Sequence, residues 1–262
     1  MTDALRFEWA RIRTIRSTYW LFGMGVVITA AIAGILAYVF RDDEHTVEMD
    51  AFVLLGGGEF ATFIPIFVAI MGIFATGHEY RYGTIQPTLT TLPQRSALLS
   101  AKLLVVVAVA IALVVVSLAV NLGLAALLWG EIPDLGRSPM NEIIPGYFVL
   151  IALNAILGVG LGQLFRGVPS AIVVLLVTPL VVEGLITGLS NVPALDWLVP
   201  VVKFLPFTAG ARLIATTPAD EAFGPNSAQY EIFDRWAAGG VFAVFVAIIL
   251  AVAWYLFQKR DA

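Results

Sequence analysis

The stretch AKLLVVVAVAIALVVVSLAVNLGLAALLW, residues 101–129, decides the fold class of this chain. It contains no charged residue after Lys102, and polar side chains are few within it. A helix needs about 20 predominantly apolar residues to cross the hydrocarbon core of a bilayer, so this stretch predicts a transmembrane helix. A membrane β-barrel would instead show alternating segments of about ten residues, and the stretch has no such alternation.

Five more apolar runs predict five further transmembrane helices. We place them at residues 19–40, 52–76, 146–165, 170–190 and 237–257. The composition agrees, because 60% of the residues are hydrophobic and 13% are charged, against about 25% charged in a soluble domain. The mean hydropathy is +0.91. We therefore predict an all-α polytopic membrane protein with six transmembrane helices, forming a single transmembrane domain over residues 1–262.

Residues 1–17 precede the first span and are basic. Leu5, Trp9 and Ile12 recur at helical spacing, and arginines fill much of the rest: Arg6, Arg11, Arg13 and Arg16. This pattern predicts an interfacial amphipathic helix, with its apolar face in the acyl chains of membrane lipids and its arginines at the headgroups. The alternative is a plain basic tail that only sets the topology.

The lysine and arginine residues predict the orientation of the chain. With the N-terminus inside, the fifteen divide ten to five between the inner and outer sides. Those on the outer side are Arg41, Arg137, Lys203, Arg212 and Arg235. Because positive charge favours the cytoplasmic side and the span count is even, we expect both termini in the cytoplasm and the chain in the cell membrane.

Residues 191–236 contain an apolar piece that does not form a simple span. Pro200, Lys203, Pro206 and Arg212 interrupt it. A continuous helix facing lipid would not tolerate these residues well. We expect an extracytoplasmic loop with broken helices, which could be re-entrant, at the outer face before the last span.

The chain lacks the sequence features of a catalytic or metal site. It has no cysteine, and none of its three lysines follows a glycine, which excludes a phosphate-binding loop of the G-x-x-x-x-G-K-[ST] kind. Its two histidines, His45 and His78, lie far apart in the sequence. We therefore expect no catalytic residue, cofactor or metal on this chain, and no nucleic-acid partner.

A few polar residues within the predicted spans are candidates for a substrate pathway. Asn121 and Asn154 have a simpler interpretation as hydrogen-bonding groups between helices, as do Gln163 and Thr178. Glu183 stands out because a carboxylate within a span is costly and usually faces protein or water. Two interpretations stay open: Glu183 lines the pathway, or it lies at the outer interface, hydrated or paired with Lys203 or Arg212.

Two pairs of glycines have the G-x-x-x-G spacing that permits close helix packing. They are Gly158 with Gly162, and Gly184 with Gly188. The motif is common by chance in apolar segments. It is compatible with helix contacts within the chain as well as with dimerisation.

The polar stretch at residues 77–100 separates the second and third predicted spans on the inner side. Thr84 is a suitable N-cap for a short helix whose apolar face would contain Ile85, Leu89 and Leu92. Such a helix is suited to docking in a groove on a soluble partner. The alternative is a surface helix that rests on lipid.

Three features together resemble the permease subunit of ABC transporters of the ABC-2 type. They are the basic lead RFEWARIRTIRSTYW, the inner loop EYRYGTIQPTL followed by LPQR, and the LPFTAG stretch before the last span. The most specific element is E-Y-x-x-G-T-I, formed by Glu79, Tyr80, Gly83, Thr84 and Ile85.

The resemblance implies a division of labour between chains. Two permease halves, either two copies or a copy and a homologous permease, would form the pathway, and separate cytoplasmic ABC ATPase subunits would use ATP and Mg. A coupling helix within residues 83–92 would dock on the ATPase, with Glu79, Tyr80, Arg81, Gly83, Thr84, Ile85 and Leu89 as the docking residues. Export is the direction expected from the family.

The sequence alone leaves two other functions open. An ion- or proton-coupled secondary transporter would need charged residues at mid-membrane and usually repeated halves, for which Glu183 alone is thin support. A membrane-embedded enzyme would need a nucleophile, a metal cluster or an acid–base pair, and we find none in the sequence. The substrate is not indicated.

Overall fold

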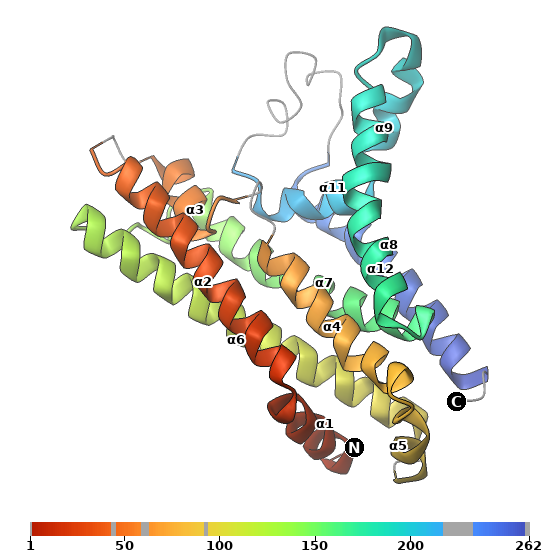
Figure 1. Ribbon diagram of the computed structural model, residues 1–262. Coiled ribbons are helices and arrows are strands. Elements are labelled where there is room, and N and C mark those ends of the chain that lie inside the picture. Colours follow the sequence, from red (N-terminus) through yellow and green to blue (C-terminus); the bar gives the residue numbers. More distant parts are fainter. Residues whose placement is uncertain (1, 43–45, 59–62, 92–93, 217–232, 260–262) are drawn as a thin grey trace.

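The computed structural model describes residues 2–42, 46–58, 63–91, 94–216 and 233–259. All the regular structure in these residues is helical, and six helices are long and apolar enough to cross a membrane (Figure 1). The predicted all-α polytopic membrane fold is therefore confirmed. The described part of the chain also contains short helices at both ends of the bundle.

Helices α4 (Phe63–Arg81) and α7 (Met140–Phe165) form the centre of the bundle. Their backbones approach closely because glycines lie at the contact. A Cβ atom on Gly158 would lie 2.0 Å from the carbonyl oxygen of Ala69, and one on Gly162 would lie 2.1 Å from Thr76 Oγ1. The first G-x-x-x-G pair thus packs two helices of the same chain together.

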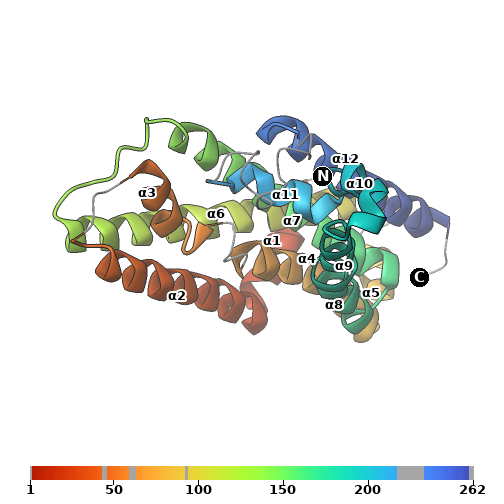
Figure 2. The same ribbon diagram turned by 90° about the horizontal axis from the view of Figure 1, so that it is seen from above.

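The other spans surround this central pair. Helices α2 (Arg16–Val39) and α6 (Arg95–Trp129) run side by side on one flank (Figures 1 and 2). Helix α12 (Arg235–Lys259) packs against α7 on the other flank. The remaining span is a rod made of α8 (Val168–Val177), the π-helix η2 (Thr178–Glu183) and α9 (Gly184–Leu189), which diverges from α2 and α6 in Figure 1.

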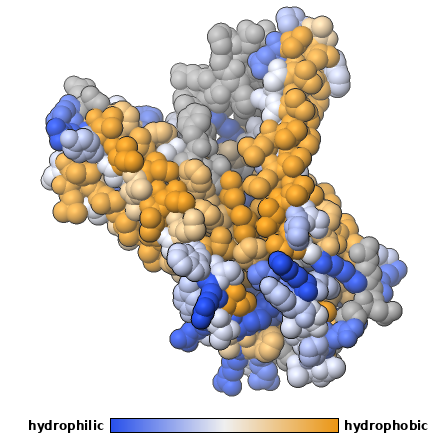
Figure 3. All heavy atoms as spheres, viewed as in Figure 1, coloured by the Kyte–Doolittle hydropathy of each residue, from blue (hydrophilic) through white to orange (hydrophobic). Residues whose placement is uncertain are grey.

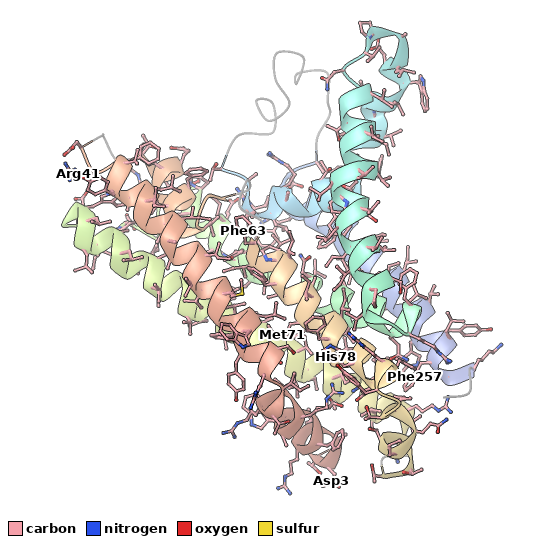
Figure 4. All side chains as sticks on the ribbon, viewed as in Figure 1. Asp3, Arg41, Phe63, Met71, His78 and Phe257 are labelled. Atoms are coloured by element: carbon pink, nitrogen blue, oxygen red, sulfur yellow. The ribbon has the colours of Figure 1, made fainter. Side chains whose placement is uncertain are left out.

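One end of the bundle holds both ends of the described chain. Helix α1 (Thr2–Thr14), helix α5 (Ile85–Thr91) and the last turn of α12 lie there. In Figure 4, Asp3, His78 and Phe257 lie toward this end, and Arg41 lies at the opposite end. On the face shown in Figure 3, hydrophilic residues gather at this end and the middle is largely apolar, as expected for a band in contact with lipid.

The predicted start of the second span is wrong. Residues 52–76 do not form one helix, because α3 (Val47–Leu54) ends at a run of three glycines with positive φ. Gly56, Gly57 and Gly58 adopt this conformation easily because they lack a Cβ atom, and they terminate the helix. The span itself is α4, which begins at Phe63 and continues to Arg81.

The broken helices before the last span are confirmed. They are η3 (Pro193–Leu198), α10 (Val199–Val202), α11 (Pro206–Ala211) and η4 (Arg212–Ile214). The stretches Pro193–Val202 and Pro206–Ile214 meet at an angle of 59°. Pro206 starts the second stretch, as expected for a residue that has no N–H to donate. Residues 217–232, in the same predicted loop, lie outside the described residues.

Candidate functional site

A sharp turn connects α4 to the short helix α5. Gly83 has φ +66°, a left-handed conformation that favours glycine. The Thr84 N–H donates to the Glu79 carbonyl at 2.9 Å, and the Gly83 N–H donates to the Tyr80 carbonyl at 3.4 Å. These two bonds form the Schellman motif that ends many helices. The glycine of the E-Y-x-x-G-T-I element therefore serves to stop α4 and redirect the chain into α5.

Helix α5 turns its apolar side toward the rest of the chain. Ile85 is only 4% exposed and belongs to the main hydrophobic core, and Leu89 is half-buried against that core. We expected Ile85, Leu89 and Leu92 to contact a soluble partner, but the structure packs Ile85 and Leu89 against the core of the chain, and Leu92 lies outside the described residues. Spacing identifies an apolar face but not what covers it. The exposed side of the turn and helix carries Tyr82, Gln86, Pro87 and Thr90.

Four charged side chains meet just above α5, and we call them the buried ion cluster: Glu8, Arg11, Glu79 and Lys102. Lys102 on α6 donates to Glu8 on α1 at 2.7 Å and to Glu79 on α4 at 2.5 Å. Arg11 on α1 pairs with Glu8 at 2.8 Å and also with Glu79. The cluster thus joins three helices, two of which lead directly into and out of α5.

The cluster is shielded from water. Glu8, Lys102 and Glu79 are 0%, 2% and 4% exposed. Burial raises the pKa of the Glu8 carboxyl, although nearby Lys102 and Arg11 act in the opposite direction. Two positive and two negative groups compensate one another, so no net charge is left in a poorly hydrated site. Removal of one member would leave an uncompensated buried charge.

Tyr80, the residue after Glu79, points to a different neighbour. Its hydroxyl accepts a hydrogen bond from Gln163 on α7 at 2.5 Å, and the Arg166 guanidinium lies over its ring, 5.4 Å from the centroid. Arg81 is exposed and stacks on Tyr82. Adjacent residues of one motif therefore fix the end of α4 to α1 and α6 on one side and to α7 on the other.

Glu183 lies in a second polar site, toward the other end of the bundle. Its Oε1 accepts from the Phe207 N–H at 2.9 Å, and its Oε2 accepts from the Thr208 N–H and hydroxyl at 2.7 and 2.8 Å. These donors belong to the first turn of α11, where unpaired N–H groups attract negative charge. Glu183 caps this helix and is not paired with Lys203 or Arg212 as one interpretation proposed.

A cavity of about 230 Å³ adjoins Glu183. It is surrounded by the helices α4, α7, α8, α11 and α12 and by the η2 segment. Its lining is mostly apolar, and Asn154 contributes to it together with Glu183 and Thr208. Asn121 lies elsewhere, with its amide donating to the Leu54 carbonyl at 2.8 Å, so it stabilises the contact between α6 and α3. The structure therefore brings two of the three candidate pathway residues together and separates the third.

Comparison with known families decides what kind of protein carries these sites. The sequence matches the family described as ABC-2 family transporter protein over residues 4–189. The chain belongs to the ABC-2 transporter family. It is thus the membrane domain of an ABC-type permease and a multi-pass membrane protein, which confirms the resemblance. No curated protein matches the chain.

The matched region of this ABC-2 chain extends from α1 to the end of α9. It includes the buried ion cluster, the Gly83 turn and Glu183. The LPFTAG stretch, which forms α11 and which we counted in the resemblance, lies outside it.

In the buried ion cluster of this ABC-2 permease, Glu8 and Lys102 were not predicted as site residues. We counted Lys102 only as a positive charge for topology, although an ionisable residue within a membrane-spanning helix usually pairs with another polar group. Leu5, Trp9 and Ile12 were expected to face lipid together. In the structure the buried side of α1 is Ala4, Glu8 and Ile12, while Leu5 is half-buried and Trp9 is exposed.

Proposed function

We propose that this chain is the permease subunit of an ATP-driven ABC exporter in the cell membrane. In this proposal both termini and α5 face the cytoplasm, where separate ABC ATPase subunits bind and hydrolyse ATP with Mg²⁺. Two permease chains, either two copies or a copy and a homologous permease, form the pathway. The chain itself catalyses no reaction, and it changes between inward-open and outward-open states when ATP closes the ATPases.

The buried ion cluster is the observation that carries this proposal. A force applied to α5 acts on the ends of α4 and α6, and the cluster fastens both of these helices to α1. Separating desolvated charges costs several kcal/mol, so the three helices would move as one unit. The arrangement suits a device that carries motion of a soluble partner into the bundle.

The exposed side of the α4–α5 turn is the proposed docking surface for the ATPase. It offers an aromatic ring at Tyr82, which is 67% exposed, and the polar residues Gln86 and Thr90 beside Pro87. A short helix that presents such side chains can enter a groove on a folded partner. Ile85 and Leu89 would then support α5 from inside and would not touch the ATPase.

The cavity beside Glu183 and Asn154 is the proposed part of the pathway within one chain. At about 230 Å³ it is smaller than typical ligand pockets of roughly 300–1,000 Å³, which favours a pathway completed by a second permease. The α8–α9 rod is the least buried of the six spans, and a Cβ atom added to its Gly188 would meet no atom within 4 Å in the described part of the chain. This surface is available to a second permease chain.

Co-purification tests the proposed function. The chain would carry a C-terminal tag and be captured from its native membrane in mild detergent. We expect an ATPase with a phosphate-binding loop to be retained, and ATP hydrolysis and transport to persist when an uncoupler dissipates the proton gradient. Transport by the purified chain alone, abolished by the uncoupler, would instead favour a secondary transporter.

A further inference from the structure

A groove of about 350 Å³ lies on the outside of the bundle between α1, α2 and α6. Its floor is formed by Ala108, Val109 and Ala112 of α6. The walls come from the last turns of α1 and the first turns of α2: Trp9, Ile12, Arg13, Thr18, Tyr19 and Phe22. None of the residues that line the groove belongs to the buried ion cluster.

One rim of this groove is positively charged. Arg13 lines it, and Arg16, at the first position of α2, is exposed three residues further on. The helix breaks between them at Ile15, which has an extended backbone and gives α2 no side-chain cap. Arg13 on the rim, with Arg16 three residues away at the uncapped N-terminus of the 24-residue helix α2, therefore makes this edge of the groove favourable for an anion.

Aromatic residues place the rim at the membrane interface. Trp9 and Tyr19 are 48% and 60% exposed and flank the groove. Tryptophan and tyrosine are enriched where the acyl chains meet the headgroups. The Tyr19 hydroxyl donates to the Arg13 carbonyl at 2.8 Å, which holds the break between the two helices in shape.

We propose that this groove binds one anionic phospholipid. An acyl chain would lie along Ile12, Phe22 and Val109, because the lining there is apolar and a hydrocarbon chain fits it at little cost. The phosphate would lie against Arg13 and Arg16 at the start of α2. Basic pockets between helices near the headgroups are suited to such lipids. A zwitterionic lipid would fill the apolar part of the groove equally well, but its headgroup, which has no net charge, would bind the arginines of the rim more weakly.

Retention of lipid by the full-length chain tests the proposal. The protein would be reconstituted in bilayers that contain phosphatidylglycerol or phosphatidylcholine, then extracted in detergent and examined by native mass spectrometry. Two variants disrupt the site in different ways: Arg13→Gln with Arg16→Gln removes the charge, and Ala112→Phe fills the floor. The matched controls are Arg137→Gln, an exposed arginine in the loop after α6, and Ala119→Phe, two turns along α6 from Ala112.

We expect wild type and both controls to retain one phosphatidylglycerol molecule in preference to phosphatidylcholine. The double arginine variant should bind it about 30-fold more weakly, from roughly fivefold for each charge near the headgroup. Ala112→Phe should lose both lipids. The proposal is overturned if all variants retain phosphatidylglycerol equally, if the two lipids are retained equally by wild type, or if Ala112→Phe changes only self-association.

Discussion

Lys102 shows how single residues can join distant parts of a membrane protein. Its ammonium group is buried between Glu8 and Glu79, and the contact with Glu8 spans 94 residues of sequence. A lone lysine at this position would be unfavourable, because a buried charge needs a compensating partner. The three helices that provide these groups therefore depend on one another.

The change Lys102→Met tests this dependence. It leaves Glu8 and Glu79 to share only Arg11 within the cluster, so we expect the free energy of unfolding to fall by about 3–5 kcal/mol. Adding Glu8→Gln removes one carboxylate charge and should recover much of the lost stability, because the charges of Arg11 and Glu79 then compensate each other. Unfolding in mixed detergent–SDS micelles measures both values.

The control for these two variants is Lys259→Met. Lys259 is exposed at the end of α12 and should change stability by no more than about 0.5 kcal/mol. Two results would show that the cluster does not couple these helices. One is that Lys102→Met and Lys259→Met lower the free energy of unfolding equally, and the other is that the double variant is less stable than Lys102→Met alone.

Two glycines with the same sequence motif provide a second test at the scale of the residue. Gly158→Ala would force a Cβ atom to 2.0 Å from the Ala69 carbonyl, so α4 and α7 must separate, at a cost of about 2 kcal/mol or more. Gly188→Ala meets no atom within 4 Å in the described chain and should be neutral or slightly stabilising. Thermal melting distinguishes the two, and equal melting temperatures would contradict the packing.

At the scale of the element, the η2 segment links one span to the broken helices. A π-helix carries an extra residue per turn and is often found where a side chain has a special position. Here it ends at Glu183, whose carboxylate caps α11. Any shift of the rod would therefore pull on α11 and alter the cavity between them.

The change Glu183→Gln weakens this link. The amide keeps one acceptor oxygen but turns its NH₂ group toward a backbone N–H, so charge-assisted bonds of about 1.5–3 kcal/mol are lost. We expect lower thermal stability and lower transport together. Asp196→Asn, at an exposed carboxylate in η3, should leave both unchanged. If Glu183→Gln alters transport while stability stays at the wild-type value, Glu183 acts on substrate and not as a cap.

The elements also explain how far the sequence could predict this structure. Long apolar runs predicted the spans because a helix in contact with lipid needs apolar side chains along nearly its whole length. The start of α4 was missed because the apolar residues continue to Leu55 and only the backbone of Gly56–Gly58 ends α3. The partners of Glu183 were missed because they include backbone N–H groups, which no residue type reveals.

At the scale of the whole molecule, the two polar sites lie at different depths of the bundle. The buried ion cluster is next to α5, at the end with both termini, whereas α11, which lines the Glu183 cavity, lies nearer the other end (Figure 1). The tightly packed pair α4 and α7 connects them, since α4 contributes Glu79 to the first and Pro65 to the second. A rigid central pair is suited to carrying motion from one site to the other.

We propose that the exposed side of the α4–α5 turn binds an ATPase, and retention of that ATPase by variants of this surface tests the contact. The variant Tyr82→Ala with Thr90→Arg changes this surface and leaves Ile85 and the buried ion cluster in place. The control, Tyr38→Ala with Leu135→Arg, changes exposed residues at the opposite end. We expect the first variant to fold normally but to lose ATPase binding at least tenfold, together with ATP-driven transport, while the control retains both. Normal ATPase retention by the first variant would show that the exposed side of the α4–α5 turn is not the ATPase-binding surface.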